Sequence, residues 1–322
     1  MRALYAESFD AGDPLSGLVL GDRPEPEVPD GWTTVTVKAA ALNHHDLWSL
    51  KGVGLGADEL PRILGCDAAG LDEDGNEVVV HAVISSPDWL GDETLDPRRS
   101  LLSERFEGTF ADRVAVPRRN LVPKPERLSF EEATCLPTSW LTAYRMLFTN
   151  GSLKPGDTVL VQGVGGGVST ALIVLARAAG LRVYATSRDE TKRARALQLG
   201  AHEVVESGAR LPGKVDAVME TVGAATWSHS IKSLKPGGTV VISGATSGPN
   251  PDNAELTRIF YLSMRVIGST MGTRQELGEL TAFLATTDTR PLIDRVLPLE
   301  RATEGFEAMA RGDVFGKVVF TL

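Results

Sequence analysis

Four of the five residues from Gly163 to Gly167 are glycine, and they stand between a short apolar β-branched run and a longer apolar segment. Glycine lets the backbone turn tightly against a pyrophosphate, and the free N–H groups of a helix that starts there stabilise the anion. The spacing departs from G-x-G-x-x-G at Val168 and fits G-x-x-G-x-x-small through Gly163, Gly166 and Ser169. A glycine-rich surface loop is the alternative, but the flanking strand and helix patterns favour dinucleotide binding.

The residues after the next predicted strand indicate which dinucleotide binds. Enzymes selective for NAD usually end this strand with Asp or Glu, which accepts a hydrogen bond from the ribose 2′-hydroxyl. Here the strand is followed by Ser187 and Arg188, with Lys192 one turn later, and a hydroxyl with two cations suits a 2′-phosphate. Asp189 comes next, and we expect its carboxylate to cap the following helix. An ordinary solvated basic helix face is the alternative; we favour NADP(H) and predict that NADPH binds more tightly than NADH.

Alternating strands and helices surround these residues and must position them. Such alternation indicates βαβ units and a parallel sheet covered by helices on both faces. The predicted strands are 157–162, 182–186, 215–219 and 239–242, and the predicted helices are 168–179 and 190–199.

The stretches on either side of this region have a different character. Residues 1 to about 124 carry short β-like runs, and a cluster of prolines marks a domain boundary at their end. After residue 270 the pattern predicts one helix, 275–285, and two strands, 292–297 and 317–322. These elements are too few for a third domain, so they must pack onto one of the first two.

The composition limits the classes of function. A chain of 322 residues with 42% hydrophobic and 23% charged residues suits two globular domains, so wholesale disorder is excluded. The net charge of −9 argues against a dedicated nucleic-acid binder, and no apolar run reaches the roughly 18–20 residues of a membrane span. The two cysteines, Cys66 and Cys135, build neither a disulfide framework nor a four-cysteine zinc site. With no signal-peptide pattern either, we expect a cytoplasmic protein with reduced thiols.

Further motifs run nearly from end to end of the chain. They are Ala41–Trp48, Leu64–Gly70, Glu107–Ala111, Leu141–Tyr144 and Gly316–Val319. Together with the glycine turn, they make the chain resemble the medium-chain dehydrogenase/reductase superfamily, specifically its zinc-lacking quinone oxidoreductase-like (zeta-crystallin-like) branch. The resemblance implies an α/β fold in which a Rossmann doubly wound parallel sheet, residues 125–270, is inserted into a β-rich GroES-like catalytic domain. That domain would comprise residues 1–124 plus 271–322, with the active site in the cleft.

Many members of this superfamily carry a catalytic zinc, and the resemblance aligns its three ligand positions with Asn43, Cys66 and Thr138. Only the cysteine of these three binds zinc well. The stretch 84–106, which corresponds to a four-cysteine lobe in zinc-containing relatives, has no cysteine. We therefore predict a metal-free enzyme. The neighbouring donors that remain open as ligands are Asp67, His44 and His45.

The resemblance also implies a set of cofactor contacts. The set comprises Gly163, Gly166, Gly167 and Val168 at the pyrophosphate, Ser187, Arg188 and Lys192 at the 2′-phosphate, Val222, Gly223, Ser243, Gly244, Ser269 and Thr270 after later strands, and Lys317 from the C-terminal segment. Ligands of such sheets bind beyond the carboxyl ends of the strands, where these short segments fall. The alternatives are ordinary turn chemistry for Ser243, Ser269 and Thr270 and a plain surface lysine for Lys317.

For catalysis, the resemblance places Asn43 and Thr142 near the nicotinamide and Trp48 on the substrate side. Hydride would pass to the acceptor while Asn43, backbone N–H groups or water stabilise the oxyanion. No proton donor stands out. Neighbouring residues on an extended segment point in opposite directions, so at most one of His44 and His45 faces the cleft, and a structural or exposed histidine is the simpler interpretation.

Three functions therefore compete. The first is a zinc-independent, NADPH-dependent reductase of a small-molecule quinone or α,β-unsaturated carbonyl compound. The second is a zinc-independent alcohol or aldehyde dehydrogenase, and the third is a catalytically silent NADPH-binding sensor or structural protein. We expect neither a nucleic acid nor a membrane as a partner. Likeness to relatives predicts a homodimer paired through a sheet edge near residues 255–270.

Overall fold

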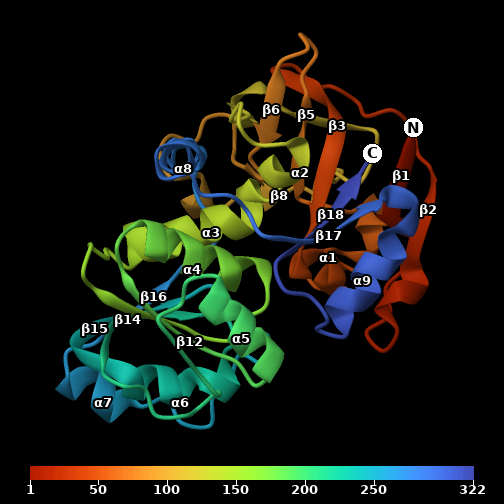
Figure 1. Cartoon of the computed structure of the whole chain (residues 1–322). Helices are drawn as coiled ribbons and strands as arrows, with labels where there is room; N and C mark the ends of the chain where they lie inside the picture. The colour runs from red at the N-terminus through yellow and green to blue at the C-terminus, as the bar shows by residue number, and fades with distance from the viewer. The chain divides into compact units, whose positions relative to one another are not determined.

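The computed structural model describes residues 1–322, which fold into two compact units. Unit 1 combines Met1–Leu141 with Met271–Leu322, and unit 2 is the continuous segment Thr142–Thr270 (Figure 1). No helix in the structure has both the length and the apolar character that a membrane crossing requires.

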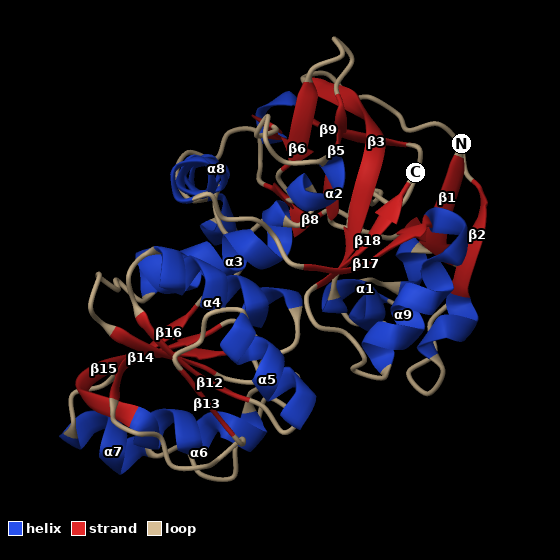
Figure 2. Ribbon diagram, in the orientation of Figure 1, coloured by secondary structure: helices blue, strands red, loops and turns tan.

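Unit 1 is rich in β-structure (Figure 2). Its strands are β1 (Arg2–Ala6), β2 (Leu18–Asp22), β3 (Trp32–Leu42), β4 (Arg62–Ile63), β5 (Asp67–Leu71), β6 (Glu77–Val80), β7 (Val83–Ile84), β8 (Ser100–Leu101), β9 (Arg113–Pro117), β10 (Leu121–Pro123), β17 (Ile293–Pro298) and β18 (Lys317–Thr321). Seven of them form one sheet in the order β10-β6-β5-β3-β18-β17, with β9 also paired to β3. Two smaller sheets have the orders β2-β1-β4 and β7-β8.

Short helices connect these strands. The α-helices of unit 1 are α1 (His44–Ser49), α2 (Phe130–Ala133), α8 (Arg274–Thr287) and α9 (Ala302–Ala310), and Leu136–Trp140 is π-helical. Single 3₁₀ turns occur at Pro14–Gly17, Ala57–Glu59, Glu93–Leu95, Arg118–Asn120 and Leu299–Arg301. Because α2 contacts β3 and β5, the segment after residue 124 belongs to unit 1. The first boundary therefore lies after Leu141, later than the residue 124 expected from the prolines.

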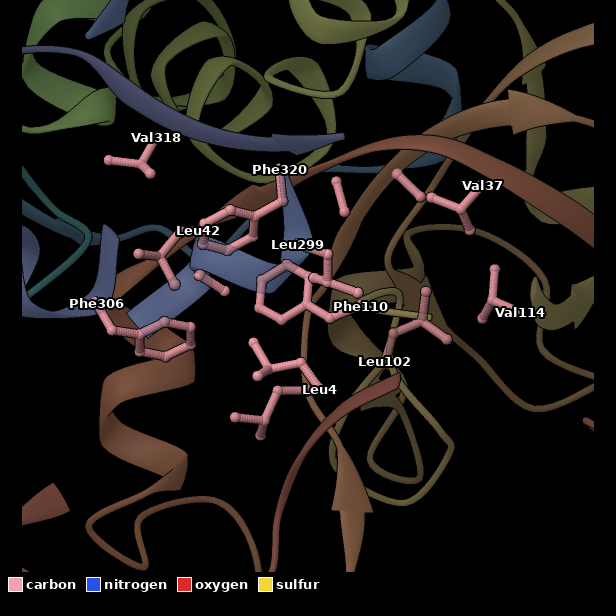
Figure 3. Packing of buried hydrophobic residues seen from close by; sticks show 14 of the residues in the cluster. Leu4, Val37, Leu42, Leu102, Phe110, Val114, Leu299, Phe306, Val318 and Phe320 are labelled. Carbon is pink, nitrogen blue, oxygen red and sulfur yellow. The ribbon is translucent and has the colours of Figure 1, made fainter. Parts of the chain in front are cut away.

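The core of unit 1 forms where its two parts of the chain meet. Phe110 from the first part packs edge-on against Phe306 and Phe320 from the second, with ring centroids 6.3 and 5.2 Å away (Figure 3). Leu42 and Val318, also in this cluster, belong to paired strands. Each large apolar side chain buried in this way contributes about 1.5–3 kcal/mol. The few elements after residue 270 thus complete the first domain rather than form a third.

Unit 2 is a six-stranded sheet in the order β13-β12-β11-β14-β15-β16, and every neighbouring pair is parallel. Its strands are β11 (Thr158–Val161), β12 (Arg182–Thr186), β13 (Glu203–Val205), β14 (Val215–Glu220), β15 (Leu234–Ile242) and β16 (Arg265–Gly268). Its α-helices are α4 (Gly167–Ala178), α5 (Glu190–Gln198), α6 (Ala224–Ser233) and α7 (Leu256–Tyr261), and Arg145–Asn150 is π-helical; α3 (Leu141–Tyr144) begins at the unit boundary. The strand order reverses between β11 and β14, as in a doubly wound nucleotide-binding fold, so the predicted Rossmann class is confirmed.

The strand register of unit 1 brings the residues of a polar site together. Val318 of β18 pairs with Leu42 of β3, and Ala41 of β3 pairs with Asp67 of β5. The residue before Val318 is Lys317, so three neighbouring strands bring Lys317, Asp67 and the residue after Leu42 to one place. No local sequence pattern specifies such a meeting, because it depends on strand pairing across the whole chain.

Candidate functional site

The glycine turn joins β11 to α4 in unit 2. Gly163 and Gly165 have positive φ angles of 68° and 150°, and Gly166 is the N-cap of the helix. The Ser169 hydroxyl accepts a hydrogen bond from Gly165 N at 3.0 Å and donates to Gly166 O at 3.1 Å, which fixes the turn. A Cβ built on Gly166 would meet no atom within 4 Å. Open space therefore lies over the start of α4, where an anion can approach the free N–H groups.

Gly163 lies where the carboxyl ends of three neighbouring strands meet. Its N–H donates to Thr186 Oγ1 at 3.2 Å, and Val164 N–H donates to Thr186 O at 2.8 Å. A Cβ on Gly163 would come within 2.4 Å of Val222 Cγ2, so the position requires glycine. The turn is thereby packed against the ends of β12 and β14, at the edge where ligands of such sheets bind.

A buried hydrogen-bond network continues from the glycine turn, and none of its residues was predicted. Thr186 Oγ1 donates to Gln162 Oε1 at 2.6 Å, and Gln162 Nε2 donates to Ser230 Oγ at 2.9 Å. Ser230 Oγ donates in turn to Glu220 Oε2 at 2.5 Å. The network therefore links the ends of β11, β12 and β14 to helix α6 through side chains.

Glu220, the last residue of β14, is the acceptor at the end of this network and is fully buried. Besides Ser230, its carboxylate accepts hydrogen bonds from Val222 N at 2.8 Å, Gly223 N at 3.0 Å and the Thr226 hydroxyl. It thus holds the loop that packs on the glycine turn. A usable sequence signal was an acidic residue ending an apolar strand, followed by hydroxyl residues spaced one helical turn apart.

The predicted 2′-phosphate residues occupy one short loop. Asp189 caps α5 by accepting from Lys192 N at 2.9 Å, as predicted, so its carboxylate has a structural role. The Ser187 hydroxyl accepts from Asp189 N at 3.2 Å, and Arg193 donates to the carbonyls of Ser187 and Arg188 at 2.9 and 3.1 Å. Arg193 therefore shapes the loop, while the Arg188 side chain is exposed.

Lys192 connects this loop with the glycine turn. A Cβ built on Gly165 would stand 3.1 Å from Lys192 Nζ, so the ammonium lies over the turn. Unit 2 holds 14 Lys or Arg and 9 Asp or Glu, a net charge of +5 within a chain of net charge −9. The unit with the anion-binding geometry thus carries an excess of positive charge, which favours a phosphorylated ligand.

The other predicted cofactor contacts of unit 2 follow successive strands. Ser243 and Gly244 come after β15, and Ser243 N donates to Glu220 O at 2.9 Å. Ser269 and Thr270 come after β16, while Gly167 and Val168 are the first residues of α4. Because the sheet is parallel, it brings all these residues to the edge that carries the glycine turn. Their contact with a cofactor stays a prediction.

A second polar cluster lies in unit 1. Lys317 Nζ donates to Leu42 O at 2.9 Å, to Asn43 Oδ1 at 2.6 Å and to Asp67 Oδ2 at 3.1 Å. Lys317 is 2% exposed and Asp67 is fully buried, so this ion pair is shielded from water. Thr138 Oγ1 donates to the other carboxylate oxygen of Asp67 at 2.5 Å. The polar groups of this cluster therefore satisfy one another's hydrogen bonds and charges.

This cluster changes the roles expected for two residues. Both Nδ2 hydrogens of Asn43 are used, by Ala41 O at 3.2 Å and Asp67 Oδ2 at 2.9 Å, so the amide has no donor left for an oxyanion. All three ammonium donors of Lys317 are likewise used inside unit 1, which leaves none for a cofactor. No donor is thus left for the oxyanion contact predicted for Asn43 or for the cofactor contact predicted for Lys317, while the place of Asn43 near the nicotinamide stays a prediction. Thr142 is buried on α3 as the first residue of unit 2.

The two adjacent histidines lie on helix α1 rather than on an extended segment. His44 points outward, and its ring lies 6.5 Å from that of Trp48, which is 38% exposed. His45 points inward, with Nε2 3.1 Å from Glu104 Oε1 and Nδ1 3.5 Å from Cys66 Sγ. One histidine and Trp48 therefore share an exposed face of α1, and the other histidine is part of the interior.

The residues of unit 1 do not fit a catalytic zinc ion. At the aligned ligand positions, Asn43 and Thr138 are hydrogen-bonded to Asp67, and the Lys317 ammonium beside them repels a second cation. The Cys66 thiol donates to a backbone carbonyl at 3.2 Å, and burial raises the pKa of this thiol. Zinc needs several thiolate, imidazole or carboxylate ligands that converge on it.

Unit 1 has one other group of donors: single ligand atoms of His45, Asp46 and Cys66 lie within 4.8 Å of one another. The two Asp46 oxygens accept from Asn43 N at 2.8 Å and Gly65 N at 3.0 Å. Burial raises the pKa of Asp46 to about 6. Each donor thus already has a partner within the protein, and the group serves to anchor α1.

Known proteins resemble both units. A family model described as alcohol dehydrogenase GroES-like domain matches residues 29–126, and one described as zinc-binding dehydrogenase matches residues 167–286. A solved structure of an NAD-dependent alcohol dehydrogenase has a TM-score of 0.92 and 36% identity, with 100% of both chains covered. Quinone oxidoreductase of Mus musculus is 28% identical over 100% of this chain and 98% of its own. Acryloyl-coenzyme A reductase of Sulfurisphaera tokodaii is 27% identical over 95% of this chain and 97% of its own.

Proposed function

Because the chain belongs to the medium-chain dehydrogenase/reductase superfamily, and is an oxidoreductase of that type, we propose a specific activity for it. It is a zinc-independent, NADP(H)-dependent reductase of quinones or α,β-unsaturated carbonyl compounds. The observation that carries the proposal is the closed Lys317–Asp67–Asn43 cluster, which fills the zinc-ligand region with a protein cation. Loss of the metal removes the Lewis acid on which simple alcohol oxidation depends.

Unit 2 offers the groups that would bind the cofactor. We assign the start of α4 to the pyrophosphate and Ser187, Arg188 and Lys192 to the 2′-phosphate. Because its Nζ also lies over Gly165, Lys192 would contact the pyrophosphate as well. When bound, the reduced nicotinamide supplies a hydride. Two features support NADPH over NADH: the carboxylate nearest the end of β12, Asp189, is engaged as a helix cap, and Arg188 and Lys192 stand in or beside the loop.

The proposed class of acceptor follows from the groups that can assist the reaction without a metal. An electron-poor alkene or quinone needs alignment and a hydrogen bond to its oxygen rather than a metal. The exposed face formed by His44 and Trp48 supplies an aromatic surface and a polar group for such a planar acceptor. Two relatives carry names of this chemistry, quinone oxidoreductase and acryloyl-coenzyme A reductase.

Two alternatives stand beside this proposal. The name of the solved relative, an NAD-dependent alcohol dehydrogenase, favours alcohol or aldehyde oxidoreduction with NAD. A catalytically silent nucleotide-binding protein would use the same glycine turn without turnover.

The two buried free thiols suit a reducing compartment, and we propose the cytoplasm.

One panel of assays separates these functions. We expect the purified protein to oxidise NADPH with quinones and enones, with a kcat/KM at least about tenfold above that for NADH, and to be unaffected by a zinc chelator. Oxidation of alcohols with NAD⁺ would favour the first alternative. Tight NADPH binding with no turnover of any acceptor would favour the second. Stoichiometric zinc that is needed for turnover would contradict the proposal.

We also propose a homodimer paired through strand β16. This strand is at one edge of the unit 2 sheet, and its Val266 is 45% exposed. Phe260 and Tyr261, at the end of the neighbouring α7, are 72% and 79% exposed. Unpaired edge strands and large exposed apolar side chains favour pairing with a second copy. Sedimentation velocity should therefore give a dimer that Val266→Lys converts to a monomer; a wild-type monomer at micromolar concentration would exclude this pairing.

A further inference from the structure

We propose that the Lys317 ammonium occupies a cation site lined by oxygens of Leu42, Asn43 and Asp67. Because this cation is covalently part of the chain, we call Lys317 a resident cation. The chain would then need no ion there, and shortening Lys317 would leave a site that accepts one. The inference concerns unit 1 alone and depends neither on the substrate nor on the cofactor proposed above.

The geometry resembles a coordinated ion more than an ordinary ion pair. The ammonium has three N–H donors, and each meets a different kind of oxygen: a backbone carbonyl at 2.9 Å, a side-chain amide at 2.6 Å and a carboxylate at 3.1 Å. Oxygens of these kinds are the ligands that hard cations prefer in proteins. With Lys317 only 2% exposed, no solvent competes for them.

Hydroxyl groups hold the oxygens in place around the ammonium. Thr138 Oγ1 donates to Asp67 Oδ1 at 2.5 Å, and Ser139 Oγ donates to Asn43 Oδ1 at 3.3 Å. The Asn43 amide donates to the same Asp67 oxygen that accepts from Lys317. Thr138 and Ser139 make no hydrogen bond to Lys317, and the bond between Asn43 and Asp67 does not involve the ammonium, so the oxygen cage should persist without it.

The charge balance gives the cage its affinity for a cation. Lys317 is the only charged partner within 4 Å of the fully buried Asp67 carboxylate. Removing one member of such a pair leaves the other buried and uncompensated, which is strongly destabilising. A cation of the right size that enters the vacated volume would restore the balance.

The test removes the Lys317 ammonium and offers a free cation in its place. In Lys317→Ala the lost atoms correspond to propylammonium, so this ion and Mg²⁺ are the two probes, used at matched ionic strength. We expect the Tm of Lys317→Ala to fall by about 6–20 °C. We expect either probe, at ten times its Kd, to raise that Tm by about 3–5 °C. The wild type should not respond.

Two control variants make the result specific. Lys235→Ala removes a half-exposed lysine paired with Asp216, and neither probe should raise its Tm. Lys317→Ala/Asp67→Asn removes the negative charge as well, and it should regain part of the lost Tm and lose the response to both probes. An equal response in the single and double variants, or none in Lys317→Ala, would overturn the proposal.

A measurement on the wild type covers the case in which Lys317→Ala does not fold. In ¹⁵N-labelled protein at neutral pH, an exposed ammonium exchanges its protons too fast to be detected, whereas a buried and fully hydrogen-bonded one is protected. Two lysines meet this description: Lys317, and Lys124, whose Nζ contacts Pro125 O, Leu128 O and Glu77 Oε2. We expect Lys317→Arg to remove one protected ammonium signal and Lys124→Arg to remove a different one. A set of protected signals that Lys317→Arg leaves unchanged would refute the resident cation.

Discussion

Replacing Glu220 with alanine is expected to lower the free energy of unfolding of unit 2 by about 3–5 kcal/mol. The carboxylate accepts from two backbone N–H groups and from the hydroxyls of Thr226 and Ser230, all around a fully buried side chain. Alanine leaves these donors without an acceptor where water has little access. Urea unfolding followed by the fluorescence of Trp227, the tryptophan of unit 2, measures the change.

Two variants calibrate this expectation. Asp216→Asn removes a partly exposed carboxylate on the same strand and should cost at most about 1 kcal/mol. Glu220→Gln keeps one acceptor oxygen and should lie between the two. If Glu220→Ala unfolds at the same urea concentration as Asp216→Asn, the network contributes no more than a surface pair.

Replacing Arg188 with alanine is expected to raise the Kd for NADPH by about 10–100-fold and to leave the Kd for NADH nearly unchanged. A charge-assisted contact to the 2′-phosphate is lost, and NADH has no such group. Lys192→Ala should weaken both cofactors, because Lys192 Nζ lies over Gly165 as well as near the loop. Enhancement of nicotinamide fluorescence on binding gives all four constants.

The control for these variants is Lys214→Ala, which removes a cation of unit 2 that donates to the carbonyl of Lys232. It corrects for the general loss of positive charge and should change neither constant by more than about twofold. Arg193 is unsuitable as a control because its guanidinium holds the carbonyls of Ser187 and Arg188. Equal losses of NADPH and NADH binding in Arg188→Ala would show that Arg188 does not bind the 2′-phosphate.

The features that the sequence predicted well are local. The strand after the glycine turn was expected at 182–186 and is β12 at the same residues, and the helix expected at 190–199 is α5. Each has a turn or cap signal within a few residues, such as Asp189. Helices α6 and α9 were not predicted, since α6 is mostly polar and neither has a strong start signal. Their positions depend on the sheets against which they pack.

The features that the sequence did not predict are non-local. Strand pairing brings Asn43 and Lys317, 274 positions apart in sequence, to 2.6 Å from one another and uses their donors, which no local pattern predicts. Glu220 was not recognised because its value as an acceptor depends on the fold of the loop around it. Propensities identify the elements, but the partners of a buried polar group follow from which strands are neighbours.

The insertion of unit 2 between the two parts of unit 1 has a consequence for biosynthesis. Ribosomes build the chain from residue 1 onward, so Thr142–Thr270 is complete before Lys317–Thr321 has been made. The end of β3 from Ala39 to Leu42 then lacks its partner β18, and the Asp67 carboxylate has no counter-charge. Residues Met1–Leu141 must therefore stay incompletely folded until β18 has been made, while unit 2 is able to fold first.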